Sequence, residues 1–494
     1  MADDRLGAGC PAAGGTWERL RGQGSLAAVA LVALLNFLGR AWEGDLHGDP
    51  VHYAALAKNI VASGEWLTLR DAPDLVYAKK PPLMMWLVAA NFRFFGANTF
   101  TAKVWSCIFA VGVCILVFLT GRRLFGETAG LLGGCSVALM PGMVMNSMDL
   151  RLDSAVSLAV AATVYGAVRA VQEGRPRWLF LAGVAGGLGF MTKMSAGVHV
   201  PAVLVLVLLA SRPRWLLHPC FWGAVALGVA IAAPWHLVVA GRHAESFTGV
   251  YFRQEMGERM VFGKHVAGNL VGNAVTLVVL TLPWFALAAY AVARWRRGGP
   301  AERWGMLVAL LWTAEVLLVT AVPPKRYERY MATAFPAIGL LAGRGLAWLI
   351  PRRHHGRVPR VVRVLAALQA FAMVLVPVEL HNYRCLGFTQ ARPMLDALEP
   401  GTALAGYWPP EPGKEEREGG GPWGLRAKAT YYLDRQVAYY ARAEDLAATP
   451  TRFAAARERH VADLVKLGFE VAFELDESYR LLMRPAPAGS GAKP

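Results

Sequence analysis

The feature that most constrains the fold of this chain is a series of apolar runs, each of roughly 16–22 residues, separated by short loops that carry arginine. An apolar helix of about 20 residues crosses the core of a bilayer, and it satisfies its own backbone hydrogen bonds there. Hydrophobic residues make up 55% of the 494 positions. The sequence therefore predicts an all-α polytopic membrane protein.

The net charge of +16 indicates membrane topology rather than nucleic-acid binding. The arginines cluster between the apolar runs and form no basic face with interleaved aromatic residues. Cytoplasmic loops of membrane proteins are enriched in Lys and Arg. The arginine loops therefore predict which end of each span lies in the cytoplasm. Because Arg19 and Arg21 precede the first run, we expect the N-terminus in the cytoplasm.

Following the arginine loops along the chain predicts about eleven (±2) transmembrane helices, with the C-terminus outside. A shorter run at 83–95 contains Asn91 and Arg93 and is predicted to be an interfacial helix in the first outer loop. The predicted spans are 25–42, 101–120, 128–145, 153–171, 178–191, 197–210, 221–240, 270–293, 304–322, 330–350 and 361–380.

Changes in composition divide the chain into three predicted parts. Residues 1–24 form a cytoplasmic tail, 25–380 a transmembrane domain with its first outer loop at 43–100, and 381–494 a small extracytoplasmic α/β domain. Within the last part, strands are predicted over 403–407, 436–440 and 469–475. Helices are predicted over 426–433 and 452–467.

The first outer loop begins with an acidic residue before an amphipathic helix, in the segment GDPVHYAALAKNIVASGEW. Asp49 precedes Pro50, which suits the first turn of a helix. Asp49 is therefore a candidate N-cap. It is equally a candidate general base that takes a proton from an acceptor hydroxyl. The two roles are compatible if one oxygen caps and the other faces a site.

Cations on the outer side of the membrane need a reason, because positive charge is depleted there. Lys80 precedes a proline pair, and Lys193 lies between two short spans. One interpretation is an interfacial anchor. The other interpretation is that these lysines bind an anion. A lipid phosphate bound there would offset the roughly 2.5–3.5 kcal/mol that a charge costs inside a membrane.

Two acidic residues are further candidates. Asp153 lies at the start of a predicted span, either as a helix cap or as a second carboxylate for a metal or a sugar hydroxyl. Glu315 lies near the middle of a span and is a functional candidate by its position, although the sequence names no partner for it.

The residues from about 48 to 350 resemble the C-type glycosyltransferase superfamily, in particular the protein O-mannosyltransferase and aminoarabinose lipid A transferase group. The acidic outer loop is followed in family order by YAKKPPLMMWL, NFRFFGANTFTAKVWS, RRLFG, RLDS, FMTKMSAG, PWHLVV and KRYERYMATAFPAIGLL. This resemblance implies a polyprenyl-phosphate-sugar donor, an outward-facing site and inversion at the sugar carbon.

The resemblance also implies roles for individual residues. Asp49 matches the catalytic aspartate and Asp153 a second acidic position. Lys80 matches the lysine that meets the donor phosphate. Substrate binding is expected from a larger set that also includes Tyr53, Tyr77, Lys193, Arg259 and Tyr330.

The chain departs from the family pattern at three places. Pro50 stands where the family often has Glu, and Lys79 stands where the aminoarabinose enzymes carry Glu. Their Glu-His pair in a later outer loop appears here as Glu255 and Met256. No cofactor is therefore assigned; a divalent metal stays open, with Glu255 and His265 as candidate ligands.

The sequence thus predicts a membrane glycosyltransferase with Asp49 as its catalytic carboxylate, using a polyprenyl-phosphate sugar. Two alternatives remain: an oligosaccharyl transferase or ligase of the same fold, and a polytopic lipid or sugar transporter. The acceptor is left open between lipid A, a glycan and a protein. Richness in Ala, Gly and Arg suggests a bacterial inner membrane, with the C-terminus in the periplasm.

Overall fold

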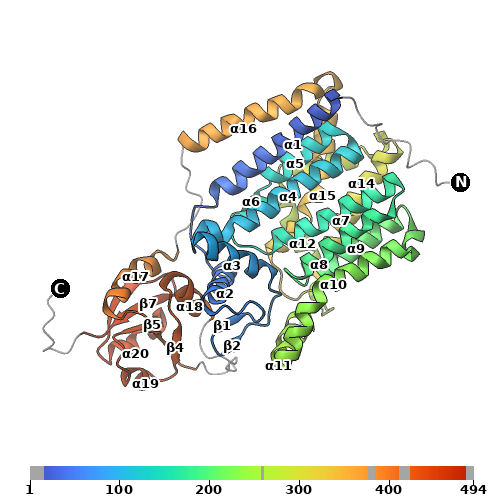
Figure 1. The fold of residues 1–494 in the computed structure, drawn as a ribbon. Coiled ribbons are helices and arrows are strands. Elements are labelled where there is room, and N and C mark those ends of the chain that lie inside the picture. The colour runs from blue at the N-terminus through green and yellow to red at the C-terminus, as the bar shows by residue number, and fades with distance from the viewer. Residues whose placement is uncertain (1–15, 258–260, 376–383, 411–422, 486–494) are drawn as a thin grey trace. The chain divides into compact units, whose positions relative to one another are not determined.

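The computed structural model describes residues 16–257, 261–375, 384–410 and 423–485. The chain divides into two compact units (Figure 1). Unit 1 comprises Met1–Trp42, Ala78–Met84 and Lys103–Val378. Unit 2 comprises Glu43–Tyr77, Met85–Ala102 and Glu379–Pro494. Two helices, α3 (Leu83–Phe95) and α4 (Thr99–Phe125), contribute residues to both.

The regular secondary structure in the described residues of unit 1 is helical. Its longer helices are α1 (Thr16–Phe37), α5 (Glu127–Leu139), α6 (Pro141–Ser147), α7 (Asp153–Glu173), α8 (Phe180–Phe190), α9 (Ala196–Leu209), α10 (Pro219–Arg242), α12 (His265–Thr281), α13 (Trp284–Ala293), α14 (Pro300–Ala321), α15 (Phe335–Leu349) and α16 (Val358–Leu375). Short segments connect them: η1 (Leu38–Arg40), η2 (Pro176–Leu179), η3 (Pro213–Leu217), α11 (Ala244–Ser246), η4 (Phe247–Gly257), η5 (Trp295–Arg297), η6 (Glu328–Thr333) and η7 (Arg352–Arg357).

The apolar helices confirm a multi-pass membrane protein. Four helices among the described residues, α4, α7, α10 and α14, are long and apolar enough to cross a membrane. The number rises to six if the bent pairs α5–α6 and α12–α13 each count as one span. Each predicted span coincides with a helix or a pair of helices in the described residues, and 83–95 is helical over the predicted bounds. Residues 376–380 of the last predicted span lie outside the described residues. The total of eleven spans stays a prediction.

Proline explains one break that the predicted spans did not include. The predicted span 128–145 is two helices, α5 and α6, bent by 61° at Met140–Pro141. Met140 is extended, with ψ at 126°, because the ring of the following proline disfavours helical geometry there.

Small residues allow the helices of unit 1 to pack closely. Gly343 of α15 faces α5, and a methyl group on it would lie 2.3 Å from the carbonyl oxygen of Ala129. The same methyl group would lie 2.5 Å from the backbone nitrogen of Gly133. Glycine at such crossings lets two backbones approach, which drives helix association in membranes. At another face, α16 lies beside α1 (Figure 1), and Gln369 donates a hydrogen bond to Asn36 at 2.9 Å.

Unit 2 contains a small α/β domain, as predicted. Its five-stranded sheet has the order β4-β3-β5-β7-β6, in which β3 is parallel to β4 and β5 while the remaining pairs are antiparallel. The strands are β3 (Leu404–Tyr407), β4 (Val437–Tyr440), β5 (Phe453–Arg457), β6 (Glu470–Glu474) and β7 (Tyr479–Met483). The helices around it are α17 (Leu386–Leu398), α18 (Trp423–Lys428), η8 (Ala429–Leu433), α19 (Ala443–Ala447), η9 (Glu458–His460) and α20 (Val461–Val465).

One prediction for this domain is wrong. Residues 452–467 are not one helix, because the central strand β5 occupies 453–457 and only the short η9 and α20 follow. The sequence FAAAR favours a helix locally, since alanine has the highest helix propensity. In the fold, Phe453 and Ala455 enter one core of the domain, and Ala454 and Ala456 enter the core on the opposite face. Burial on both faces of the sheet overrides the local preference.

The first outer loop also belongs to unit 2. It contains α2 (Asp49–Ser63), β1 (Arg70–Ala72) and β2 (Leu75–Val76). The ammonium of Lys58 donates to the carbonyl of Tyr431 at 2.8 Å and forms an ion pair with Asp434. Burial lowers the pKa of Lys58, and the hydrogen bond with Asp434 opposes that shift. Tyr432 donates its hydroxyl to the carbonyl of Leu46 at 2.9 Å. The outer loop and the C-terminal domain thus form one body.

We predict that Gly343→Ala destabilises unit 1, because its methyl group would overlap backbone atoms of α5. Overpacking of this kind costs about 1–3 kcal/mol, so the melting temperature of the detergent-solubilised protein should fall by several degrees. Gly268→Ala on α12 is the matched control, since nothing lies within 4 Å of its added methyl group. Equal melting temperatures for the two variants would contradict the close helix crossing.

Candidate functional site

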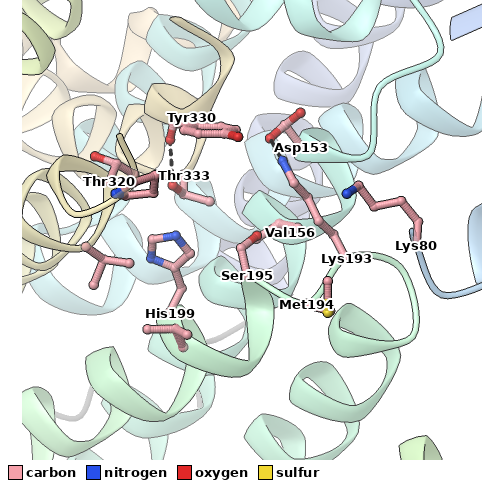
Figure 2. Close-up of a pocket in the computed structure, with 13 residues that line it drawn as sticks. Lys80, Asp153, Val156, Lys193, Met194, Ser195, His199, Thr320, Tyr330 and Thr333 are labelled. Carbon is pink, nitrogen blue, oxygen red and sulfur yellow. Dashed lines mark hydrogen bonds and ion pairs between the residues drawn. The ribbon is translucent and has the colours of Figure 1, made fainter. Parts of the chain in front are cut away.

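A cavity of about 140 Å³ in unit 1 gathers the charged residues that the sequence singled out. We call it the lysine cavity. Figure 2 shows Lys80, Lys193 and Asp153 together on one side of it, and His199, Thr320 and Thr333 on the other. Its remaining lining is largely apolar and includes Val156, Met194, Val198, Val319 and Pro323.

Lys193 is placed by the turn that joins α8 to α9. The backbone nitrogen of Lys193 donates to the carbonyl of Gly189 at 2.9 Å, and the carbonyl of Lys193 accepts from Ala196 at 3.0 Å. Backbone bonds thus fix the chain on both sides of Lys193. The same turn holds the segment that follows Lys80, because Leu83 donates its backbone N–H to the carbonyl of Met191 at 3.0 Å. Two lysines from distant parts of the sequence therefore line one cavity.

Asp153 occupies the first position of α7, and the N-cap is Leu152. The interpretation of Asp153 as the helix cap is therefore wrong in this structure. Its carboxylate accepts a hydrogen bond from the ammonium of Lys193 at 2.6 Å. The guanidinium of Arg329 lies 4.0 Å from its second oxygen. A carboxylate at a helix N-terminus is favoured by the macrodipole, and here it also lies between two cations.

Tyr330 completes this side of the cavity. It lies in η6, and the ammonium of Lys193 is 4.7 Å from the centroid of its ring. A cation over an aromatic face is attracted by the negative potential of the ring. Tyr330 therefore helps to hold the Lys193 ammonium in the cavity.

Glu315 has a partner that sequence reasoning missed. Its Oε1 lies 2.9 Å from Nδ1 of His199, and both side chains are buried. His199 lies in α9 and Glu315 in α14, so the pair joins two helices far apart in sequence. The available signal was a histidine in an otherwise apolar helix, AGVHVPAVLVLVLL. The apolar periodicity of a helix does not show that His199 pairs with an acidic residue on another helix.

Asp49, Tyr53 and Tyr77 lie in unit 2. The N-cap of α2 is Gly48, which has a φ of 66°, and Asp49 holds the first helical position. Asp49 is therefore not the cap residue that one interpretation proposed. Tyr53 and Tyr77 are buried, and the ring of His52 packs edge-on to Tyr77 at 5.0 Å. The grouping of these residues with the lysine cavity stays a prediction.

The candidate metal ligands do not form a recognisable site in the described residues. His265 begins α12, and its Nε2 lies 2.9 Å from the carbonyl oxygen of Val322. Glu255 lies in η4, and nothing is described of its side chain. Arg259 lies outside the described residues. Across 16–257, 261–375, 384–410 and 423–485, no three His, Cys, Asp or Glu residues group as metal ligands.

A second cavity of about 250 Å³ is lined by Arg329, whose guanidinium lies 4.0 Å from Asp153 of the lysine cavity. We call it the arginine cavity, and its polar lining comprises Asn146, Arg151, Tyr327, Glu328 and Arg329. Arg151 pairs with Asp149 at 3.2 Å. Because Arg329 also lies near Asp153, the two cavities are linked by one carboxylate.

Two kinds of sugar transferase match this chain in sequence. A family model described as dolichyl-phosphate-mannose-protein mannosyltransferase matches residues 79–237. The undecaprenyl phosphate-alpha-4-amino-4-deoxy-L-arabinose arabinosyl transferase of Edwardsiella ictaluri is 24% identical over 338 residues, which is 66% of this chain and 60% of the relative. A protein of the same description from Sodalis glossinidius is 30% identical over 311 residues, covering 59% and 53%. The chain thus spans between half and two thirds of the length of these relatives.

Comparison with solved structures shows the fold. ArnT from Cupriavidus metallidurans bound to undecaprenyl phosphate matches with a TM-score of 0.73 at 19% identity, covering 97% of this chain and 99% of that one. The archaeal oligosaccharyltransferase AglB from Archaeoglobus fulgidus matches with a TM-score of 0.55 at 11% identity, covering 94% and 75%. Fold and sequence together show that this chain resembles the aminoarabinose transferases and the protein mannosyltransferases of the C-type glycosyltransferase superfamily.

Proposed function

We propose that this protein transfers a sugar from a polyprenyl-phosphate donor to an acceptor on the extracytoplasmic face, with inversion at the sugar carbon. One observation carries the proposal. Lys80 and Lys193 line a single, largely apolar cavity, in a fold shared with a protein solved with undecaprenyl phosphate bound. An apolar wall with cations at one end is complementary to a lipid that ends in a phosphate.

Electrostatics support this assignment of the lysines. A buried ammonium is unfavourable without an anion nearby, and Asp153 supplies one for Lys193. A phosphate with more than one negative charge would engage both lysines at once. When the sugar leaves, the negative charge on the phosphate grows, and fixed cations stabilise that charge without reorganisation. Lys80 and Lys193 would therefore assist departure of the polyprenyl phosphate as well as its binding.

Asp49 is the proposed catalytic carboxylate. An acceptor oxygen attacks the anomeric carbon while the bond from that carbon to the phosphate oxygen breaks, and the phosphate keeps the electron pair. Asp49 takes the acceptor proton as general base where the attacking oxygen is protonated, and orients the acceptor where that oxygen is already ionised. A single displacement of this kind inverts the anomeric centre. Tyr53 and Tyr77, which lie in unit 2 with Asp49 and both pack against His52, are proposed to bind substrate.

The composition of unit 2 supports the predicted topology. Residues 43–77 and 384–485 contribute to one compact body, so both segments must lie on the same side of the membrane. The chain between residues 102 and 384 therefore crosses the membrane an even number of times. Ten of the predicted spans lie between these residues, which satisfies this condition. The first predicted span, 25–42, takes the chain from the cytoplasm to the outer side. With the N-terminus in the cytoplasm, unit 2 is periplasmic in a bacterial inner membrane.

The matching relatives favour transfer of one sugar over transfer of a glycan. Those from Edwardsiella ictaluri and Sodalis glossinidius are named as transferases of a single aminoarabinose unit. The fold alone does not separate the two activities, because it is shared with an oligosaccharyltransferase. We therefore prefer the single-sugar enzyme.

The arginine cavity favours an acceptor with a negative charge. Arg151 and Arg329 outnumber Glu328 among the charged residues of its lining, and each arginine has five donors that suit a phosphate. Among the three acceptors left open by the sequence, a lipid A phosphate fits this lining better than a neutral glycan or a protein hydroxyl.

We predict that Asp49→Asn lowers turnover by about 10²–10⁴-fold, because the amide is a far weaker base than the carboxylate. Sugar transfer would be measured in proteoliposomes with undecaprenyl-phosphate sugars, followed by mass spectrometry of the products. Asp74→Asn is the control, since Asp74 is an exposed acid in the same outer loop. Turnover of Asp49→Asn near that of the control would overturn the assignment.

We predict that Lys80→Ala weakens binding of undecaprenyl phosphate by about tenfold or more, because a charge-assisted hydrogen bond is lost in an apolar cavity. Lys79→Ala is the matched control, since Lys79 carries the same charge next to Lys80 but does not line the cavity. Titration of the lipid into each purified variant measures the affinity. A similar loss in both variants would show that only surface charge matters.

We predict opposite effects from the two members of the Lys193–Asp153 pair. Lys193→Ala should weaken binding of undecaprenyl phosphate, because it removes a cation. Asp153→Asn should tighten it, because Asp153 competes with the phosphate for Lys193 and Arg329. The same titration distinguishes them, and weaker binding in both variants would mean that Asp153 positions Lys193 instead.

A further inference from the structure

The lysine cavity contains a second polar feature that the proposed reaction does not use. His199 and Glu315 are joined by a bond of 2.9 Å between Nδ1 and Oε1. Both are almost fully buried, with 4% of each residue exposed. The second oxygen of Glu315 is buried and makes no hydrogen bond within the described residues. An ionisable pair at this depth in a span is costly, so a functional role is the default interpretation.

The position of His199 relative to the lysines is informative. In Figure 2 the imidazole lies with Thr320 and Thr333 on one side of the cavity, whereas Lys80, Lys193 and Asp153 lie on the other. Val156 and Val198 contribute apolar wall to the same cavity. If the phosphate of a ligand binds the lysines, then a group attached to that phosphate lies next to His199.

A polyprenyl-phosphate sugar carries two groups on its phosphate, the isoprenoid chain and the sugar. The isoprenoid chain has no hydrogen-bonding atom, so an imidazole facing it would lose its water without replacement, and the loss would be unfavourable. A sugar offers hydroxyl or ammonium groups that restore the hydrogen bond. The polar character of this end of the cavity, with its imidazole and two threonines, thus matches the sugar.

Glu315 determines what the imidazole offers to a ligand. A carboxylate that accepts from Nδ1–H fixes the tautomer of a neutral imidazole and leaves Nε2 as an acceptor. Such a nitrogen recognises a hydrogen-bond donor. Glu315 acts through His199 and is therefore a positioning residue, whereas His199 is the contact.

We propose that His199, oriented by Glu315, binds a hydroxyl or ammonium group of the donor sugar and so contributes to recognition of the glycosylated lipid. This inference rests on the proposed function, because it requires a polyprenyl-phosphate sugar in the lysine cavity. The competing explanation is that the pair only ties α9 to α14, since interhelical polar bonds stabilise membrane bundles.

The two explanations differ in how binding responds to the sugar. Three probes would be titrated into the purified full chain: undecaprenyl phosphate, undecaprenyl phosphate-4-amino-4-deoxy-L-arabinose and undecaprenyl phosphate-mannose. His199→Leu removes the contact, His199→Gln keeps a polar group, and Glu315→Gln removes the carboxylate. Glu302→Gln is the control, because Glu302 also lies on α14 and pairs with Arg344 at 2.7 Å without lining the cavity.

We expect His199→Leu to weaken binding of at least one glycosylated lipid by about tenfold or more while changing the affinity for undecaprenyl phosphate less than about twofold. Glu315→Gln should shift the same lipid in the same direction by a smaller factor, and His199→Gln should restore part of the affinity. Glu302→Gln should leave all three affinities unchanged, even if its melting temperature falls. If His199→Leu does not fold, the affinities of Glu315→Gln and His199→Gln for the glycosylated lipids and for undecaprenyl phosphate are compared instead.

Two other results have distinct meanings. Equal losses for all three lipids, or no loss for any, would overturn the role of His199 in sugar recognition and leave the proposed glycosyltransferase function intact. Failure of the unaltered protein to bind any of the three lipids would overturn the proposed function itself, and the inference with it.

Discussion

The candidate site depends on the free energy of placing lysine ammonium groups in a small, largely apolar cavity. Lys193 is stabilised there by Asp153 at 2.6 Å and by the ring of Tyr330. Asp153 in turn lies between Lys193 and Arg329. Lys80 lines the same cavity. An incoming phosphate fits this arrangement because its negative charge is attracted to the cations that line the cavity.

The second constraint comes from the way unit 2 is assembled. Lys58 of the outer loop pairs with Asp434, and Leu46 exchanges hydrogen bonds with Tyr432. These contacts join segments that are separated by most of the sequence. They require both segments to lie on one side of the membrane. Asp49 begins α2 in this same body, so its proposed role requires a reaction on the side of the membrane where unit 2 lies.

The proposed chemistry assigns different tasks to the polar groups. In this proposal, cations at one side of the lysine cavity bind the phosphate, and His199, oriented by Glu315, binds the sugar at the other side. The arginine cavity meets a negatively charged acceptor. Asp153 connects the two cavities through Arg329, so occupancy of one cavity would be felt electrostatically in the other.

The sequence by itself determined the elements that depend on local pattern. Apolar runs of spanning length predicted where the helices of unit 1 lie. Pro50 predicted the start of α2. The sequence also singled out Lys80, Asp153, Lys193 and Glu315, because a charge next to or within an apolar run is unusual on energetic grounds alone.

Only the tertiary structure decided which of these residues meet. It placed Lys80 and Lys193 in one cavity, paired Glu315 with His199, and turned FAAAR into the central strand β5. Each outcome rests on contacts between segments far apart in the chain. Local propensity and periodicity describe only neighbouring residues, whereas burial, ion pairing and sheet formation are set by what the folded chain brings alongside.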